Sequence, residues 1–306
     1  MSGELNKEKI DVSVVLPVYN EKEAIRASVL DMKEAMDKLP YSYEIVLVDD
    51  GSTDDCLDEV ADLGAIVVRH DRNRGGGVAR VTGMLTARGS IIVQSDVDGT
   101  YPTEKLGEML ELMRTADLVI GARDKESQKR LFILRILMKG LIRKIAEFLT
   151  NSDIPDLNSG LRVYRKDIAL RYVYLYPAGH SIMSTMTIAF LSEGFRVRFV
   201  PIGYNKRVGS TSFHIVKDTY NYLQVTISTV AFFNPLRVLM PIFLFMVGLS
   251  CIFTVRDAFR LGLGPMTVLL WVMSFLVIIL AIISEQITRL ARYLAFIFYN
   301  KRAGDS

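Results

Sequence analysis

The stretch VSVVLPVYNE, residues 12–21, joins an unbroken apolar run to a polar ending. The run hardly alternates between apolar and polar residues, so it predicts a strand that is buried on both faces. Apolar residues then recur at spacings of four and three, which predicts an amphipathic helix. These residues are Ile25, Val29, Met32, Met36 and Leu39. A strand followed by such a helix is the repeating unit of an α/β domain.

The same unit recurs along the chain. Strands are predicted in EIVLVDD (44–50), AIVVRH (65–70), SIIVQSD (90–96) and DLVIGAR (117–123). Strand and helix in alternation predict a parallel sheet covered on both faces, in a domain that reaches about Pro201. In such sheets ligands bind where the strands end, at their carboxyl edge. Polar residues cluster at those positions in this chain.

Two aspartates, Asp96 and Asp98, directly follow one predicted strand. Residues two apart on an extended segment point the same way, so both carboxylates can face one point. Like charges so close repel each other unless a cation lies between them or a proton binds. Mg²⁺ takes one or two carboxylates together with phosphate oxygens. A solvated turn is the commoner explanation of an isolated Asp-x-Asp, but the place at a strand end favours a metal site.

Two further segments suit a nucleotide. In VDDGS, residues 48–52, a carboxylate could accept hydrogen bonds from a base or ribose hydroxyl, or Ser52 could cap a following helix. RNRGGGVARVTG, residues 72–83, offers bare backbone and a helix N-terminus to a diphosphate. Arg80 stands where GxGxxG has its last glycine, which disfavours a Rossmann dehydrogenase. Asp50 and Gly76 are therefore candidates for nucleotide binding.

Two uncharged runs follow Asn234. Residues 238–255 contain 18 residues without a charge, and residues 261–284 contain 24. Each approaches or exceeds the roughly 20 residues that cross a hydrocarbon core. Two buried core helices are the alternative, but they would leave an apolar hairpin without a polar face. Basic residues flank the hairpin on both sides, which predicts that both of its ends are cytoplasmic. They are Lys206, Arg207, Lys217, Arg237, Arg289, Arg292, Lys301 and Arg302.

Composition excludes several classes of protein. The formal net charge is +3 and there is no long basic tract, so a nucleic-acid partner is not expected. Cys56 and Cys251 lie in regions of opposite character, which disfavours a disulfide and favours a reducing compartment. The N-terminus lacks an apolar core of signal-peptide length, so secretion is not expected.

A basic segment and an apolar stripe indicate contact with lipid. If residues 129–144 form a helix, Arg135, Lys139 and Arg143 stack at four-residue steps, which costs roughly a few tenths of a kcal/mol per pair. Phosphate headgroups or an acceptor phosphate would offset that cost, although a solvated basic face is the alternative. Residues 214–235 carry an apolar stripe that could lie in the membrane interface or pack against the sheet.

Several segments, in their order and spacing, resemble the family-2 glycosyltransferases of the GT-A fold. They are VVLPVYNE (14–21), VLVDDGS (46–52), NRGGGVARVTG (73–83) and DVDGTYP (96–102). DLNSGLRVYRKD (156–167) and RVGSTSF (207–213), followed by two apolar spans, are similar to the dolichyl- and polyprenyl-phosphate hexose synthases. The resemblance implies an α/β GT-A nucleotide-sugar-binding domain with a mainly parallel sheet, followed by a C-terminal two-helix transmembrane hairpin.

The resemblance also implies roles for single residues. Nucleotide contacts are implied at Pro17, Tyr19, Asn20, Glu21 and Asp49. Asp96 and Asp98 are implied as ligands of Mg²⁺ or Mn²⁺ and, with Arg123 and Arg135, as the catalytic set. Contacts with an acceptor phosphate are implied at Arg123, Arg135, Ser159, Arg162 and Arg207. The chain departs from the family pattern at Thr100, where a glutamine is common, and at Ser212, where a lysine is usual.

These features predict an integral membrane enzyme of the bacterial inner membrane. It would transfer a hexose from a UDP- or GDP-linked sugar, such as UDP-glucose, to undecaprenyl or dolichyl phosphate, with inversion. Such an acceptor is already ionised near neutral pH and needs no base. The expected parts are a cytoplasmic catalytic domain (1–213), an interfacial helix (214–235), a transmembrane hairpin (236–292) and a cytoplasmic tail (293–306). The hairpin could also pair with copies of itself as a homo-oligomer.

Two other functions are less well supported. A glycosyltransferase for a hydroxyl acceptor, such as a glycolipid or polysaccharide, would need a base, and Asp156 is the attractive candidate. Processive synthases usually carry Q-x-x-R-W, which cannot form here because the single tryptophan, Trp271, lies in the second span. A scaffold that only binds nucleotide sugars is disfavoured by the intact pair of acids.

Overall fold

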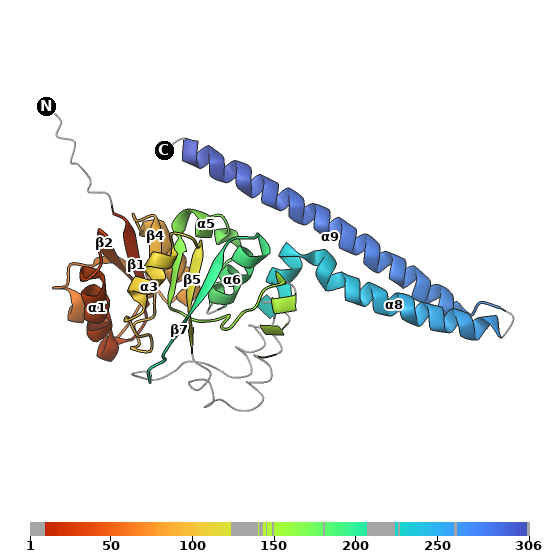
Figure 1. Cartoon of the computed structure of the whole chain (residues 1–306), viewed down its shortest axis with the longest axis horizontal. Helices are drawn as coiled ribbons and strands as arrows, with labels where there is room; N and C mark the ends of the chain where they lie inside the picture. The colour runs from red at the N-terminus through yellow and green to blue at the C-terminus, as the bar shows by residue number, and fades with distance from the viewer. Residues whose placement is uncertain are drawn as a thin grey trace. The chain divides into compact units, whose positions relative to one another are not determined.

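The structure is a computed structural model that describes residues 10–123, 140, 143–144, 146–148, 150–179, 181–206, 224–225, 227–259 and 262–304. The chain divides into two compact units. The first comprises Met1–Glu147 with Ser152–Thr226, and the second comprises Phe148–Asn151 with Ile227–Ser306. The first unit contains the sheet and the second contains two long helices (Figure 1).

The first unit is built on a seven-stranded sheet with the order β3-β2-β1-β4-β6-β5-β7. Its strands are β1 (Val12–Val18), β2 (Tyr43–Asp49), β3 (Ile66–Arg69), β4 (Ile91–Gln94), β5 (Leu118–Arg123), β6 (Arg162–Arg165) and β7 (Val197–Ile202). The pairs β3–β2, β2–β1, β1–β4 and β5–β7 are parallel. The mainly parallel sheet is therefore confirmed, and each strand predicted up to residue 123 is present.

One strand departs from the expected alternation. β6 runs antiparallel to both of its neighbours, β4 and β5. Its sequence, RVYR, has arginines at both ends and lacks the apolar run of a buried parallel strand. The structure nevertheless buries the first of these arginines, Arg162, completely. The strand was missed because that burial depends on partners elsewhere in the chain.

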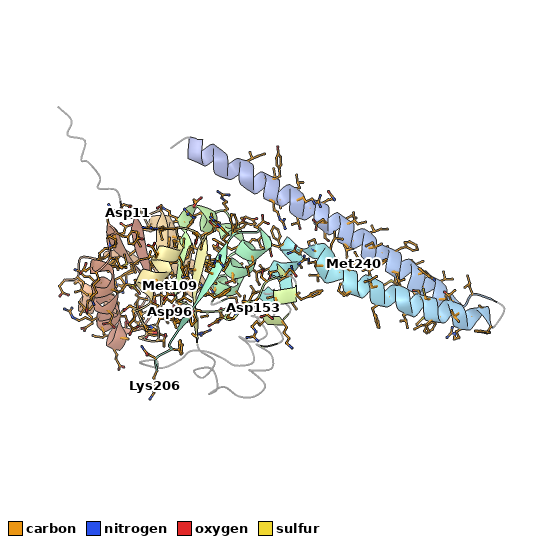
Figure 2. All side chains as sticks on the ribbon, in the orientation of Figure 1. Asp11, Asp96, Met109, Asp153, Lys206 and Met240 are labelled. Carbon is orange, nitrogen blue, oxygen red and sulfur yellow. The ribbon has the colours of Figure 1, made fainter. Side chains whose placement is uncertain are left out.

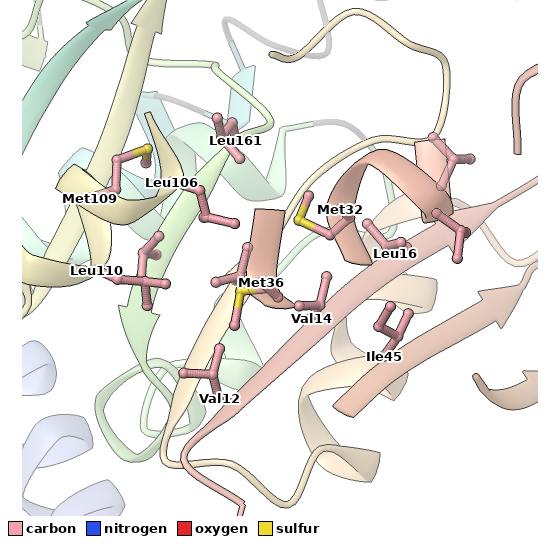
Figure 3. Close-up of a cluster of buried hydrophobic side chains, with 14 of the residues drawn as sticks. Val12, Val14, Leu16, Met32, Met36, Ile45, Leu106, Met109, Leu110 and Leu161 are labelled. Carbon is pink, nitrogen blue, oxygen red and sulfur yellow. The ribbon is translucent and has the colours of Figure 1, made fainter. Parts of the chain in front are cut away.

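Helices cover both faces of β1. On one face, Val14 and Leu16 belong to an apolar cluster with Met32 and Met36 of α1 (Lys22–Asp37) (Figure 3). α3 (Leu106–Leu112) adds its apolar side to the same cluster. On the other face, α2 (Gly76–Thr86) approaches Val15 so closely that a side chain at Gly83 would collide with it. The strand is thus enclosed on both sides, as its unbroken apolar run predicts.

Further elements of the first unit lie among its described residues. They are η1 (Cys56–Val60), α5 (Lys166–Leu170) and η2 (Val173–Leu175), and α6 (Ile182–Ser192) is a longer apolar helix among them. Nine of the residues of α6 are buried, from Ile182 to Phe190. α6 is therefore a core helix of this unit.

The second unit is a helical hairpin of α8 (Pro235–Ala258) and α9 (Pro265–Gly304). Its candidate membrane spans are Pro235–Ala258 and Pro265–Leu294, with mean hydropathies of 2.5 and 2.9. Only 6% and 22% of their most apolar windows are buried inside the structure, so these are not core helices of a globular domain. The predicted apolar hairpin is confirmed. α9 continues to Gly304, so the predicted tail forms the last turns of that helix.

Polar side chains of the hairpin pair with one another across the two helices. Trp271 donates from its indole Nε1 to the hydroxyl of Thr254 at 3.1 Å. Asp257 accepts hydrogen bonds from the Gly264 amide at 2.7 Å and from the Thr267 hydroxyl at 2.5 Å. Inside a hydrocarbon core a polar group has no water to bond, so such mutual pairing is what a spanning hairpin requires.

Residues 214–223 of the expected interfacial helix lie outside the described residues. The described residues of that segment, 224–225 and 227–233, are helical, and α8 follows from Pro235.

A buried carboxylate joins three strands of the sheet at their amino ends. Glu44 accepts hydrogen bonds from the Ser13 hydroxyl and from the Arg88 amide, each at 2.6 Å, and pairs with the Arg88 guanidinium at 2.6 Å. The Ser13 hydroxyl accepts in turn from the Gly89 amide at 2.8 Å. Burial raises the pKa of the Glu44 carboxyl, but the hydrogen bonds from Ser13 and Arg88 outweigh it, and the net pKa lies below its ordinary value.

We predict that Glu44→Gln destabilises the protein by about 1–3 kcal/mol at neutral pH, because it weakens a buried, charge-assisted network. A carboxyl whose folded pKa is depressed contributes stability above its unfolded pKa, near 4.3, and loses it as the pH falls through the folded value. The difference from wild type should therefore shrink in acid. Thermal unfolding of the detergent-solubilised chain at several pH values measures it. Glu34→Gln, which removes an exposed pair with Lys38, is the matched control and should change stability little.

Candidate active site at the carboxyl edge of the sheet

The two predicted metal ligands lie in the loop that follows β4. The side chain of Asp96 is 31% exposed, and Asp98 is nearly buried (Figure 2 labels Asp96). Thr100 donates to Oδ1 of Asp98 twice, from its amide at 3.1 Å and from its hydroxyl at 2.5 Å. Thr100 thus orients Asp98, and the Thr100 hydroxyl is already engaged.

Asp96 is held by Arg80. In the sequence this arginine is notable only because it occupies the position of the last glycine in GxGxxG. Arg80, in the middle of α2, donates from one terminal nitrogen to Oδ1 of Asp96 and from the other to the Gly76 carbonyl at 2.9 Å. The Arg80 side chain is 6% exposed. A buried arginine on the first acid of an Asp-x-Asp has no signal in the local sequence, because α2 places it there through tertiary packing.

The segment before β6 lies against the other oxygen of Asp96. A Cβ added to Gly160 would lie 2.5 Å from Oδ2 of Asp96 and 2.9 Å from the ring of Tyr101. The Gly160 amide donates to the Tyr101 hydroxyl at 2.7 Å. A glycine is therefore needed at this position to leave room for the carboxylate.

Arg123, at the end of β5, forms a two-pronged pair with Asp156. Its Nε lies 2.6 Å from Oδ2 and a terminal nitrogen lies 2.9 Å from Oδ1. Burial lowers the pKa of Arg123, but the hydrogen bond with Asp156 and the charges nearby outweigh that effect, and the net pKa lies above its ordinary value. Burial raises the pKa of Asp156, but the bonds from Arg123 outweigh it, and the net shift is downward. Both groups are therefore charged at neutral pH.

Aromatic rings link Arg123 to the loop of the aspartates. The Arg123 guanidinium lies 5.3 Å from the ring centroid of Tyr204, and that ring packs edge-on against Tyr101 at 5.5 Å. The amide of Asn205 donates to the Thr100 carbonyl at 2.9 Å. A pocket of about 230 Å³ opens here and is bordered by Asp96, Tyr101 and Asn205, among others. The ends of β4, β5 and β7 thus meet at one place.

Two of the predicted acceptor contacts, Arg162 and Ser159, lie in the interior of the first unit. Arg162 is fully buried and donates to the carbonyls of Ser159, Leu157 and Met183, as well as to the Thr187 hydroxyl, at 2.7–3.1 Å. Ser159 is fully buried as well. Neither side chain faces solvent, and Arg162 shapes the backbone of the segment that includes Gly160. Their contact with an acceptor phosphate stays a prediction.

On the nucleotide side, Asp50 is a loop-shaping residue. Its oxygens accept from the amides of Arg74 at 3.0 Å and Gly75 at 2.8 Å, and one lies 2.7 Å from Nδ1 of His70. Asp50 is 2% exposed, and its contact with the nucleotide stays a prediction. Asp49 is fully buried, lies 3.0 Å from Nε of Arg69 and accepts from the Ser52 amide.

The turn after β1 presents the remaining nucleotide candidates. Tyr19 and Asn20 are exposed, and Pro17 and Glu21 are half-buried. Asn20 adopts a left-handed conformation (φ 53°), and its side-chain oxygen accepts from the Thr53 amide at 2.8 Å. This bond fixes the turn against the VDDGS segment.

The glycine run has a packing reason beside the predicted diphosphate contact. A Cβ at Gly75 would lie 2.5 Å from the Ala178 carbonyl oxygen, and one at Gly77 would collide with Pro177. Gly76 begins α2 between them and is partly exposed. Arg135, Arg207 and Ser212 lie outside the described residues.

The residues present fit a divalent cation that brings other ligands with it. Across the described ranges there is no group of three or more His, Cys, Asp or Glu side chains that could hold a metal alone. Asp96 and Asp98 supply two hard oxygen ligands. Mg²⁺ and similar ions are commonly bound by one or two carboxylates with phosphate oxygens and water completing the shell.

Comparison with known proteins identifies the family of the chain. The model of "Glycosyl transferase family 2" matches residues 13–172, and "GtrB C-terminal hairpin" matches residues 234–290. A dolichyl-phosphate hexose transferase of Haloferax volcanii is 30% identical over 203 residues, which cover 66% of this chain and 86% of the relative. An undecaprenyl-phosphate 4-deoxy-4-formamido-L-arabinose transferase of Aeromonas hydrophila is 32% identical over 163 residues. That match covers 51% of this chain and 49% of the relative, so the chain matches about half the length of that protein.

Solved structures share the fold. Glucosyl-3-phosphoglycerate synthase from Mycobacterium tuberculosis, in complex with Mn²⁺ and UDP-glucose, superposes with a TM-score of 0.54. The two sequences are 19% identical, and the match covers 72% of this chain and 78% of that one. The likeness shows a GT-A type of fold.

We predict that Gly160→Ala weakens binding of Mn²⁺ in the presence of UDP by about tenfold or more, because the new methyl displaces the Asp96 carboxylate and small misplacements in a site are costly. Titration of Mn²⁺ by isothermal calorimetry measures it. Gly179→Ala is the matched control, since nothing lies within 4 Å of a Cβ there. Equal affinity in the two variants would show that Gly160 does not position Asp96.

Proposed function

The chain belongs to glycosyl transferase family 2, and on that premise we propose that it transfers a hexose from a nucleoside diphosphate sugar to a polyprenyl phosphate with inversion at the anomeric carbon. The relatives named dolichyl-phosphate hexose transferase and undecaprenyl-phosphate arabinose transferase support this acceptor class. The donor is UDP- or GDP-linked, with UDP-glucose as the first candidate. The donor binds over Tyr19 and Asn20, in the exposed turn that follows β1 and is hydrogen-bonded to Thr53.

The observation that carries the proposal is the pair of Arg123 and Asp156. Asp156 is the carboxylate that would have to act as a base for a hydroxyl acceptor. It is instead held at both oxygens by Arg123, with a lowered pKa, which makes it a poor base. The same pair fixes a guanidinium, the group that matches phosphate oxygens, near the loop of Asp96 and Asp98.

In this reaction the chain positions two anions, the acceptor phosphate and the diphosphate of the donor. Arg123 orients the acceptor phosphate, whose oxygen attacks the anomeric carbon while the bond to the diphosphate oxygen breaks, with the electron pair leaving on the nucleoside diphosphate. Asp96 and Asp98 would hold Mg²⁺ or Mn²⁺. Such an ion, when bound, supplies neutralisation of the charge that develops on the departing diphosphate. A single in-line displacement gives inversion.

The hairpin of α8 and α9 provides the membrane contact for a lipid acceptor. Both helices are long and apolar enough to span a bilayer. The basic residues before α8 and in the last part of α9 favour a cytoplasmic catalytic unit, anchored in a bacterial inner membrane. The hairpin also offers a surface for association of copies of the chain.

We predict that Asp98→Asn lowers sugar transfer to polyprenyl phosphate at least about 100-fold, because one of two ligands of the cation loses its charge. Asn keeps the oxygen that accepts from Thr100, so the loop should stay folded. Transfer of labelled glucose from UDP-glucose to a short polyprenyl phosphate measures activity, and thermal unfolding measures stability. Asp31→Asn, an acid bordering the same pocket, is the control and should retain activity. Near-normal turnover by the Asp98 variant would reject the metal assignment.

A second prediction separates positioning from base catalysis. The second ionisation of a phosphate monoester lies near pH 6, so the acid limb of kcat/KM should follow the acceptor. Asp156→Asn should raise the KM for polyprenyl phosphate about tenfold, because Arg123 loses its anchor, while the acid limb remains. If Asp156 were instead a general base, its replacement would remove the acid limb of kcat/KM. If the variant loses the acid limb, or if the wild type prefers a hydroxyl acceptor, the alternative of a glycolipid or polysaccharide acceptor is correct.

A further inference from the structure

The two buried arginines near the active site are held in different ways. Arg162 donates four hydrogen bonds to its own chain, three of them to backbone carbonyls. Arg80 donates one to the Gly76 carbonyl and one to Asp96, and its buried Nε has no hydrogen-bond partner among the described residues. Arg162 is thus fixed by the fold, whereas the charge of Arg80 is balanced mainly by one carboxylate.

That carboxylate is also a predicted ligand of the divalent cation. With the cation bound, the carboxylate of Asp96 would therefore interact with two positive charges, the guanidinium of Arg80 and the ion. Arg80 cannot move out to solvent easily, because its side chain is 6% exposed. A buried charge deprived of its partner is strongly unfavourable. The pair should therefore persist and lower the attraction of the site for a lone cation.

The charge count of the site points in the same direction. Asp96 and Asp98 together carry two negative charges, and Arg80 removes one of them. A cation alone meets a weakly acidic site, whereas a cation that arrives with a diphosphate brings its own negative charge.

We propose that Arg80 is a charge gate, which makes binding of the divalent cation depend on the nucleoside diphosphate. Arg80 partly neutralises Asp96 in the free protein, so that the cation binds weakly until a diphosphate supplies further negative oxygens. In this role Arg80 is a positioning residue that acts through Asp96. The inference rests on the proposed metal site at Asp96 and Asp98 and adds the order in which that site is filled.

The opposite role makes the opposite prediction. If Arg80 served only to hold Asp96 in place, removing its charge would loosen the carboxylate and weaken cation binding. If Arg80 is a charge gate, removing its charge strengthens cation binding in the absence of nucleotide. The sign of the change therefore distinguishes the two.

The test measures Mn²⁺ binding to the full chain in detergent, by electron paramagnetic resonance, with and without UDP. Arg80→Gln and Arg80→Met remove the charge, and Arg80→Lys keeps it as the matched control. We expect the neutral variants to bind Mn²⁺ without UDP about tenfold more tightly than wild type, which is the order of a single charge interaction of about 1.4 kcal/mol. The lysine variant should stay close to wild type, and UDP should enhance Mn²⁺ binding less in the neutral variants than in wild type.

The outcomes separate this inference from the proposed function. Unchanged or weaker Mn²⁺ binding by the neutral variants, with normal binding by wild type plus UDP, would overturn the charge gate alone. Absence of Mn²⁺ binding by wild type even with UDP would reject the metal site itself. Thermal unfolding checks the fold of each variant, and failure of both neutral variants to fold would overturn the gate by showing that Arg80 serves the fold.

Discussion

The negative charge of two neighbouring acids, Asp96 and Asp98, is the constraint on which the proposed site at the carboxyl edge of the sheet depends. Both acids follow β4, which lies between β1 and β6 near the middle of the sheet. The chain compensates their charge with donors: Arg80 contacts Asp96, and Thr100 donates twice to Asp98. Gly160 leaves the space that Asp96 occupies. Two carboxylates so compensated form a site that a cation and a diphosphate can complete.

A second charge pair lies beside the first and, under the proposed function, would serve the acceptor. Arg123 and Asp156 hold each other in a rigid fork, and Tyr204 covers the guanidinium. Tyr101 joins the two parts, because it contacts the Gly160 amide through its hydroxyl and Tyr204 through its ring. The donor side and the acceptor side are therefore parts of one packed arrangement. Under the proposed function, this arrangement would suit an acceptor that is already ionised and needs no base.

The sequence predicts the elements that local patterns determine, which are the strands and the apolar hairpin. It does not predict side-chain contacts that depend on residues far away in the chain. Apolar runs and charge-free spans lead directly to the strands and the hairpin. The position of Asp50 at a strand end gives no indication that the amides of Arg74 and Gly75 take its oxygens. Likewise, Arg162 looks like a surface cation, and only the carbonyls that fold around it show why it is buried. Arg80 was visible only as a departure from a glycine motif, because its partner Asp96 is 16 residues away.

Calorimetric titration of the full chain with UDP-glucose and with GDP-mannose, before and after complete chelation of divalent ions, tests the central claim most directly. The account predicts that the donor that binds loses at least about tenfold in affinity on chelation, since its diphosphate is held largely through a cation on Asp96 and Asp98. Restoring Mn²⁺ should restore the affinity. Equal affinity of the donor with and without divalent ions would contradict the account.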